Sequence, residues 1–349
     1  MNVIKPHTAM CCASSPVLIE GRILKVAQIP YTFTVHNGMN MSADAEGSFT
    51  LVLSKPIGAG TMKCYAISQN LFVANVDFSC ERCPNMAVPG IGTTDPAREK
   101  RGVWFTINRC IEGRCETAIP GSSVAVVAEG DVCVSCSSAL PESFSYPLAR
   151  YRGIELFVCC DIDDEAAFAL LDEAHSKTKQ LAALAGSASV FSQDGELLEI
   201  IDRMAECAQG GLKAETKLCA LNLFVALSKR DFSTAKPQAL LTRRQLEIAK
   251  SARNEIEADI LAPHDARTMA QARGLSATTL NSYFSRVYGT TISAYVRKRR
   301  IDAASKALLS GESISAAAIK AGYSNPSKFA AAFKREMGAS PSAFKRRPR

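Results

Sequence analysis

The chain has 349 residues, of which 47% are hydrophobic and 21% charged, so it can bury an ordinary globular core divided among two or three domains. This composition excludes a disordered tail protein. No stretch approaches the roughly 20 apolar residues that span a bilayer, and the first residues lack the apolar core of a secretory signal. We therefore expect a soluble cytoplasmic protein with no membrane partner.

Positive charge is concentrated in the last third of the chain. Residues 240–349 contain 20 Lys and Arg against 8 Asp and Glu, a balance of +12, whereas the preceding residues contain 21 against 26, a balance of −5. A basic domain attached to a mildly acidic body is typical of proteins in which one domain meets the phosphates of a nucleic acid. A solvated basic surface without that role is the alternative.

The first 160 residues carry the signs of β structure. Short runs rich in β-branched and aromatic residues are separated by Gly, Pro and Asn, as in SFTLVLS, KCYAISQNLFVANVDF, GVWFTI, SSVAVVAEGDVCVS and GIELFV. These runs predict a β-rich sandwich or barrel over residues 1–160.

The hydrophobic period changes from strand-like to helical at Asp161. Three segments with helical spacing follow, DIDDEAAFALLDEAHSKTKQLAALAG, GELLEIIDRMAECAQ and KAETKLCALNLFVALSKR. Residues 161–239 are therefore predicted to form a helical linker, whose apolar stripes either pair across a dimer or pack against the β domain. Because Ser, Thr and Pro cluster in DFSTAKPQ, we place the boundary of the last domain at Leu240.

The last domain, residues 240–349, contains two copies of one pattern. A small residue is followed four positions later by a glycine, as Ala270 is by Gly274 and Ala318 is by Gly322. The small residue lets a second helix pack closely, and the glycine permits the turn between the two helices. Each copy continues with a cap, two inward residues and a closing glycine: Ser276, Leu280, Phe284 and Gly289, then Asn325, Phe329, Phe333 and Gly338.

We interpret these copies as two helix-turn-helix units. Packed hairpins of a solenoid are the alternative, but such repeats do not concentrate this much positive charge. The predicted fold class is thus α+β, with a β-rich first domain and an all-α last domain.

The stretch between the units, TISAYVRKRRIDAASKALLSG, predicts a single helix of about 18 residues, roughly 27 Å long. This length approaches the ~34 Å between successive major-groove faces on one side of B-DNA. One chain would then present two recognition helices to adjacent groove segments. We expect the apolar positions of this helix to share one face: Ile292, Tyr295, Val296, Ala303, Ala307 and Leu308.

Residues 242–345 resemble the AraC/XylS family of bacterial transcription regulators. The second unit, AGYSNPSKFAAAFKREMGASP, matches the family signature at Gly322, Tyr323, Ser324, Phe329, Phe333, Lys334, Gly338, Ser340 and Pro341. The resemblance implies an activator that binds promoter DNA and acts on RNA polymerase. It also implies a cupin-like β domain that binds a small-molecule effector, and neighbouring helices that support a homodimer. The linker is similar to the branch whose members respond to ferric pyochelin-type siderophores.

Helical spacing identifies the outward side chains of the first recognition helix, among them Thr278, Asn281 and Ser282. An asparagine can grip adenine through two hydrogen bonds, and a threonine can contact a thymine methyl group. Asn281 and Thr278 are therefore the predicted base readers. Ordinary solvation of an exposed helix face is the alternative.

The second recognition helix offers mostly alanine and lysine. Ala330 and Ala331 cannot make the bidentate base contacts that are worth about 1–3 kcal/mol each, and the family usually has a longer polar residue at the position of Ala331. We therefore expect the first unit to set sequence preference and the second to anchor on phosphates, through its lysines and the helix start at Asn325. The predicted DNA-binding residues are Ser276, Thr278, Thr279, Asn281, Ser282, Arg286, Asn325, Ser327, Lys328 and Lys334. The basic run at residues 297–300 either touches phosphate as well or is a solvated helix face.

All 13 cysteines lie at or before Cys219, and the odd count favours a reducing compartment. The CERC and CVSC pairs have metal-ligand spacing, but residues three apart on a strand face opposite sides, so only Cys80 and Cys83 remain weak metal candidates. Because cysteine is a common buried filler, we expect no metal and no cofactor. The alternative function is a metal- or redox-responsive thiol protein, including a regulator similar to the methyl-accepting Ada type. The sequence has no PCHR-like alkyltransferase motif, and we expect no enzyme.

Overall fold

The computed structural model describes residues 16–19, 22–25, 38–43, 48–68, 71–83, 102–119, 123–137, 144–161, 188–232 and 240–346. The chain divides into two compact units between Leu240 and Leu241. The predicted helix after Asp161 and most of the DFSTAKPQ segment lie outside the described residues.

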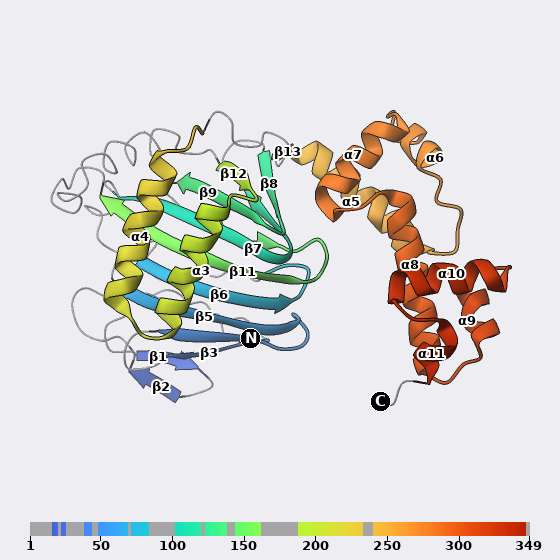
Figure 1. Ribbon diagram of the computed structural model, residues 1–349, viewed down its shortest axis with the longest axis horizontal. Helices are drawn as coiled ribbons and strands as arrows, with labels where there is room; N and C mark the ends of the chain where they lie inside the picture. Colours follow the sequence, from blue (N-terminus) through green and yellow to red (C-terminus); the bar gives the residue numbers. More distant parts are fainter. Residues whose placement is uncertain are drawn as a thin grey trace, which may run out of the picture. The chain divides into compact units, whose positions relative to one another are not determined.

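The N-terminal unit is a β structure, as the sequence predicted (Figure 1). Its described strands are β1 (Pro16–Ile19), β2 (Arg22–Lys25), β3 (Met39–Ala43), β4 (Phe49–Leu53), β5 (Ala59–Ser68), β6 (Leu71–Ser79), β7 (Gly102–Ala118), β8 (Ser123–Ala128), β9 (Asp131–Ser137), β10 (Phe144–Ser145), β11 (Tyr151–Asp161) and β12 (Ala188–Ser192). β1 pairs with β2, and a larger antiparallel sheet has the order β12–β9–β7–β11–β6–β5–β4–β3.

β7 is longer than the sequence indicated. It pairs with β11 and β9 along its first part, and with β8 and β10 along residues 114–118. The sequence pattern suggested a strand only up to Ile107, because charged residues follow. One of these charged residues, Arg109, forms an ion pair, because its Nε lies 2.7 Å from Oδ1 of Asp202.

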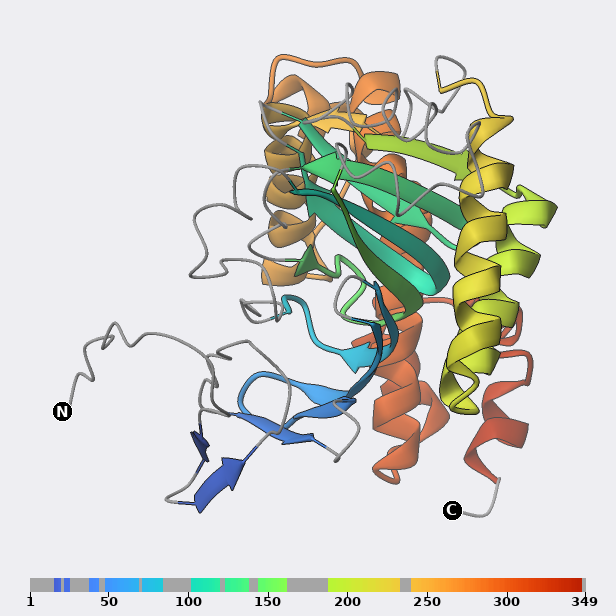
Figure 2. The same cartoon turned by 90° about the vertical axis from the view of Figure 1, so that its left-hand side faces the viewer.

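Helices α3 (Gly195–Gln209) and α4 (Lys213–Ser228) lie across one face of the sheet, and Figure 2 shows the sheet and these helices as two layers. The predicted start and end of α3 are confirmed; Asp194 caps it by accepting a hydrogen bond from the N–H of Leu197. The inner faces of both helices share one buried cluster with the sheet, which includes Ile107, Leu156, Ile201 and Leu223. Of the two alternatives for residues 161–239, the described part fits packing against the β domain, because β12, α3 and α4 belong to the N-terminal unit.

The opposite face of the sheet carries a second buried cluster with one carboxyl group at its centre. In a row across neighbouring strands, Cys133 pairs with Asn108, Asn108 with Glu155, and Glu155 with Ala74. Glu155 is 2% exposed. Asn108 Nδ2 donates a hydrogen bond to Glu155 Oε1 at 3.4 Å, and the hydroxyl of Tyr151 donates one to Asn108 Oδ1 at 3.1 Å.

The titratable groups that face Glu155 are neutral thiols and phenols, from Cys64, Cys83, Cys115, Tyr146 and Tyr151. Burial raises the pKa of Glu155 to about 7, an effect that the hydroxyl of Tyr151 offsets only in part. The carboxyl group is therefore held inside the unit without a compensating cation from these neighbours.

The C-terminal unit is helical. After β13 (Leu240–Thr242) it contains α5 (Arg243–Ala258), α6 (Ala266–Gln271), α7 (Ala277–Tyr288), α8 (Ile292–Leu309), α9 (Ile314–Lys320), α10 (Pro326–Met337) and α11 (Pro341–Lys345). The predicted linking helix is confirmed, because α8 has 18 residues. None of the described helices of either unit is both long and apolar enough to cross a membrane.

α8 buries two faces rather than the single face that we expected. The buried residues are Ile292, Tyr295 and Val296 near its start, and Ile301, Ala304, Ser305, Ala307 and Leu308 near its end. At about 100° per residue, Ile301 lies roughly half a turn around the helix from Ile292. Five of the six residues expected on the apolar face are buried and Ala303 is only partly buried. The buried surface is wider than one face because the first half of α8 packs on α7 and the second half on α9 and α10.

We predict that the N-terminal unit becomes less stable as the pH rises from about 4.5 to about 7. Over this window the folded unit binds a proton at Glu155 that the unfolded chain has already released, so unfolding gains favour as the pH increases. Replacement of Glu155 by Gln should remove this dependence of stability on pH. At pH 8 it should also raise the free energy of unfolding, by roughly 3 kcal/mol. Urea unfolding at several pH values, followed by the fluorescence of Trp104, the only tryptophan, measures the free energy of unfolding.

Glu129→Gln, at an exposed turn residue, is the matched control and should leave the pH slope unchanged. Equal pH slopes for Glu155→Gln and the wild type would contradict the prediction.

Candidate nucleic-acid interface

The two helix-turn-helix units, α6–α7 and α9–α10, repeat one turn geometry. The carbonyl of Ala270 accepts a hydrogen bond from the N–H of Leu275, and the carbonyl of Ala318 accepts one from Tyr323, both at 2.9 Å. The glycine just before each donor has a φ of +66° in the first unit and +73° in the second, a left-handed conformation that favours glycine. The repeat predicted from the sequence is thus confirmed as a repeat of structure.

Each second helix begins at a side-chain cap and ends at a left-handed glycine. The hydroxyl of Ser276 accepts a hydrogen bond from the N–H of Thr279 at the start of α7. The amide oxygen of Asn325 accepts two such bonds at the start of α10. Gly289 and Gly338 end the two helices. The predicted bounds of both recognition helices follow from these local signals.

The start of α10 does not present the anion site that we expected at Asn325. Pro326 has no N–H, and the N–H groups of Ser327 and Lys328 donate to Asn325 Oδ1 at 2.9 and 3.0 Å. The backbone donors of this described turn are therefore already engaged. Phosphate anchoring by the second unit falls instead on side chains.

Two lysines of α10 are available for such anchoring. Lys328 and Lys334 are exposed, and among the described residues neither has an ion-pair partner. Ser327 and Ala331 are exposed beside them. The outward surface of α10 therefore combines free positive charge with small side chains.

In α7 the structure separates the predicted readers into exposed and engaged side chains. Thr278 and Ser282 are exposed. Asn281 is partly buried, and its Oδ1 accepts a hydrogen bond from the N–H of Ile292, the first residue of α8, at 3.1 Å. A bidentate contact with adenine uses the same oxygen, and would therefore use the second lone pair of Oδ1.

Two further predicted residues of α7 are also partly engaged. The hydroxyl of Thr279 lies 2.8 Å from that of Ser276, within the cap. Arg286 is partly buried in the last turn, and burial lowers its pKa. Thr278 and Ser282 are therefore the side chains of α7 best placed to meet a base edge.

Three arginines of the basic run at residues 297–300 make bonds within the C-terminal unit. Arg297 Nε donates to Glu336 Oε1 at 2.8 Å, and Arg299 donates twice to Glu257, at 2.7 Å each. Arg300 donates to the backbone carbonyls of residues 260–262. Only Lys298 of this run is exposed. The three arginines hold neighbouring elements of the C-terminal unit, a role that no local sequence signal reveals.

The cysteines of the N-terminal unit do not form a metal site among the described residues. These residues contain no group of three or more His, Cys, Asp and Glu side chains that could hold a metal ion. Cys80 and Cys83 are both buried, and burial raises the pKa of both thiols, to about 11 for Cys80. A protonated, buried thiol is a weak ligand and a weak nucleophile, so these cysteines pack as apolar filler.

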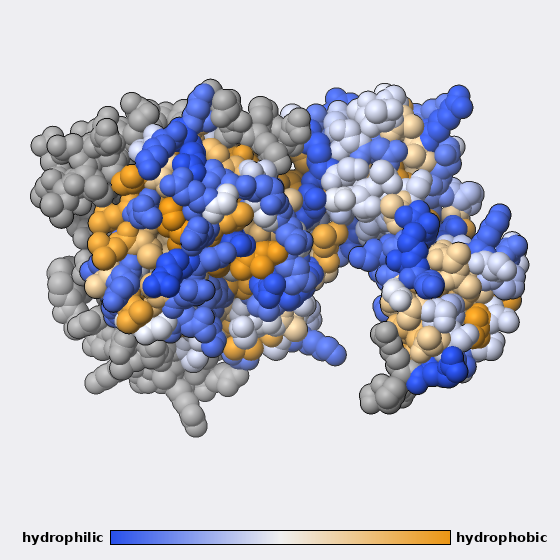
Figure 3. Space-filling view, viewed as in Figure 1, coloured by the Kyte–Doolittle hydropathy of each residue, from blue (hydrophilic) through white to orange (hydrophobic). Residues whose placement is uncertain are grey.

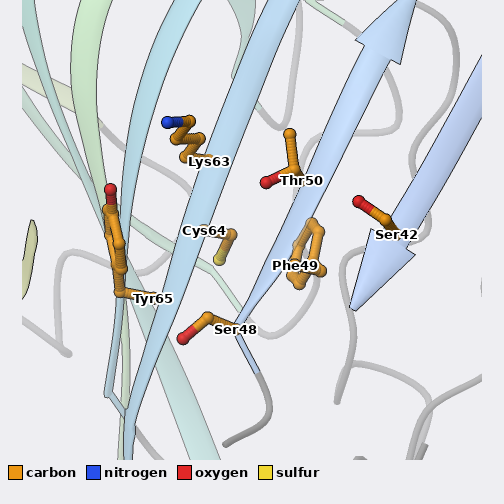
Figure 4. Close-up of a pocket in the computed structure, with 7 residues that line it drawn as sticks. All are labelled: Ser42, Ser48, Phe49, Thr50, Lys63, Cys64 and Tyr65. Atoms are coloured by element: carbon orange, nitrogen blue, oxygen red, sulfur yellow. The ribbon is translucent and has the colours of Figure 1, made fainter. Parts of the chain in front are cut away.

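The N-terminal unit has a shallow pocket of about 200 Å³ at β3, β4 and β5 (Figure 4). Polar groups on adjacent strands line it, because Ser42 pairs with Thr50 and Thr50 pairs with Lys63. The described residues that line it are Ser42, Ser48, Phe49, Thr50, Lys63, Cys64 and Tyr65. No local sequence pattern predicts this pocket, because three strands contribute to it.

Residues 269–347 match a protein-family model described as a helix-turn-helix domain. No curated protein matches the chain. Among solved structures, the C-terminal domain of AraT, a response regulator from Geobacillus stearothermophilus, is 27% identical, covers 28% of this chain and 84% of its own, and has a TM-score of 0.27. The DNA-binding domain of AdpA in complex with a target DNA is 21% identical over 28% of this chain and 88% of its own, with a TM-score of 0.26.

The AraC-like transcriptional activator CuxR is 13% identical over 81% of this chain and 91% of its own, with a TM-score of 0.32. At these TM-scores the likeness carries no argument about function. The matches give no support to the siderophore-responsive branch. The C-terminal unit contains a helix-turn-helix domain, as the sequence predicted.

We predict that Asn281→Ala loosens the start of α8. The N–H of Ile292 is buried and loses its acceptor, which costs about 1–3 kcal/mol. Hydrogen–deuterium exchange of the full chain should be faster at Ile292 in this variant. Ser282→Ala, which removes an exposed hydroxyl one position along α7, is the matched control and should leave that exchange rate unchanged. If both variants exchange like the wild type, the bond does not hold α8.

Proposed function

We propose that this chain is a cytoplasmic, sequence-specific DNA-binding transcription regulator of the AraC/XylS type, and not an enzyme. The observation that carries this proposal is the pair of capped recognition helices, α7 and α10, joined to one helix, α8, within a single unit. The helix-turn-helix match at residues 269–347 and the basic charge of this unit support it.

The two recognition helices divide the work in this proposal. Thr278 and Ser282 on α7 read base edges, and Asn281 joins them while its oxygen also accepts the bond from α8. Lys328 and Lys334 on α10 attract phosphates. Ser276, Asn325 and the other cap groups act indirectly, because they fix where each helix begins.

We predict that substitutions on α7 and α10 change DNA binding in different ways. Thr278→Ala should reduce the ratio of affinities for a selected promoter and a scrambled duplex, because it removes a base contact. Lys328→Ala should weaken binding to both duplexes by the same factor and lower the slope of log K against log salt by about 1. Binding titrations at several salt concentrations measure both effects.

Lys217→Ala, which removes one exposed positive charge from α4 in the other unit, is the control for net charge. The division of work is wrong if Lys328→Ala lowers the ratio and Thr278→Ala leaves it unchanged.

We also propose that the protein activates transcription through RNA polymerase and that a small effector binds the N-terminal unit. The pocket at β3–β5 offers the hydroxyls of Ser42, Ser48 and Thr50 together with the ammonium of Lys63, a set that suits an anionic molecule rich in oxygen. A ferric siderophore, which the sequence resemblance implies, has this chemistry. The proposal includes a homodimer through the outward face of α4, where Leu218 is 65% exposed (Figure 3). A monomer in sedimentation equilibrium would exclude the homodimer.

Genome-wide mapping of bound DNA with and without iron limitation tests the proposed effector. We expect siderophore genes among the targets, with occupancy that changes with iron, because the effector would alter the DNA-bound fraction. Targets that are unrelated to siderophores and indifferent to iron would exclude this effector while leaving DNA binding intact.

A further inference from the structure

Two arginines of α8, only two positions apart, hold different parts of the C-terminal unit. The guanidinium of Arg299 donates hydrogen bonds of 2.7 Å to both oxygens of Glu257, near the end of α5. The hydroxyl of Tyr295 donates to the same carboxylate, also at 2.7 Å. Arg299 and Tyr295 hold the pKa of Glu257 below its ordinary value, as expected for a carboxylate stabilised by donors.

Arg297 points to the second recognition helix. Its Nε donates to Oε1 of Glu336, in the last turn of α10, at 2.8 Å. The side chain of Arg297 is 36% exposed and that of Glu336 is 21% exposed, so water reaches this pair in part, and Arg335 Nε also lies 3.6 Å from Glu336 Oε1. α10 is therefore tied to α8 by a directional bond as well as by apolar packing.

The first recognition helix is tied to the same segment through α5. Arg273, in the turn between α6 and α7, donates to Glu255 of α5 at 2.7 Å, two residues before Glu257. The ring of Phe284 on α7 also packs edge-on against Tyr295, with centroids 5.3 Å apart. Both recognition helices thus reach one short part of α8.

Apolar packing alone does not fix how the two helix-turn-helix units are oriented about α8. The buried residues of α8 are mainly Ile, Val, Ala and Leu, whose contacts are not directional, whereas a guanidinium bonded to a carboxylate fixes distance and angle together. The first half of α8 packs on α7 and the second half on α9 and α10, so a small rotation within α8 shifts one recognition helix relative to the other.

We propose that the Arg299–Glu257 and Arg297–Glu336 pairs act together as a spacing clamp, which selects the separation of the two half-sites that the protein binds. This inference rests on the proposed DNA binding. The four residues are positioning residues, because their side chains bond to one another within the unit. The clamp acts on geometry, since each added base pair moves a half-site by about 3.4 Å and turns it by about a tenth of a turn.

Selection of random duplexes with the wild-type protein defines the two half-sites for the test. A series of duplexes then separates them by the selected spacing and by up to three base pairs more or fewer. The wild type should have one preferred spacing. Glu336→Gln keeps the shape of the side chain but removes its charge. It should reduce the preference for that spacing by up to about tenfold. Binding to a duplex with a single half-site gives the reference affinity for each protein.

Two further variants distinguish a spacing clamp from general support of the fold. The exchanged pair, Arg297→Glu with Glu336→Arg, should restore the preferred spacing. Glu312→Gln breaks an ion pair of 2.6 Å to Lys320 that lies outside the clamp, and should leave the preference unchanged. Because the readout is a ratio between duplexes, partial loss of folded protein does not alter it.

The outcomes separate this inference from the function on which it rests. If the wild type shows no preference for any spacing, the proposal that both helix-turn-helix units bind the DNA is wrong. A wild type with one preferred spacing that Glu336→Gln fully retains overturns the clamp, while the proposed function stands.

Discussion

The C-terminal unit depends on α8 and on the ion pairs that its arginines make. Each helix-turn-helix hairpin is too small to bury a core of its own, and each uses one half of α8 to complete it. The two halves bury different but overlapping faces, so α8 contributes to two small cores. Arg297 and Arg299 add directional bonds at the point where these cores meet. This arrangement turns two weakly stable hairpins into one body with two outward helices.

The same arrangement uses part of the positive charge of this unit for internal bonds. A balance of +12 over residues 240–349 suggests a broad phosphate-binding surface. The structure instead uses Arg273, Arg297, Arg299 and Arg300 for internal bonds, and leaves Lys328 and Lys334 exposed without an acidic partner among the described residues. Part of the positive charge of this unit is therefore used for internal bonds. In the N-terminal unit burial has a parallel effect, since it keeps cysteine thiols protonated and raises the pKa of Glu155.

Local signals made much of the fold predictable, and long-range contacts account for what was missed. Caps, turn glycines and apolar spacing act within a few residues, so the bounds of α3, α8 and both recognition helices followed from the sequence. The second half of β7, the two faces of α8 and the bond from Asn281 to Ile292 depend on partners elsewhere in the chain or on a neighbouring helix. Outward spacing alone could not show that the oxygen of Asn281 was already engaged.

The central claim is that one chain presents two recognition helices to one face of a duplex. Hydroxyl-radical footprinting of the full chain on a promoter identified by selection tests it most directly. We predict two short protected segments about one helical turn, roughly 10 base pairs, apart on the same face of the DNA. A single protected segment at saturating protein, or uniform protection without a turn-length period, would contradict the account.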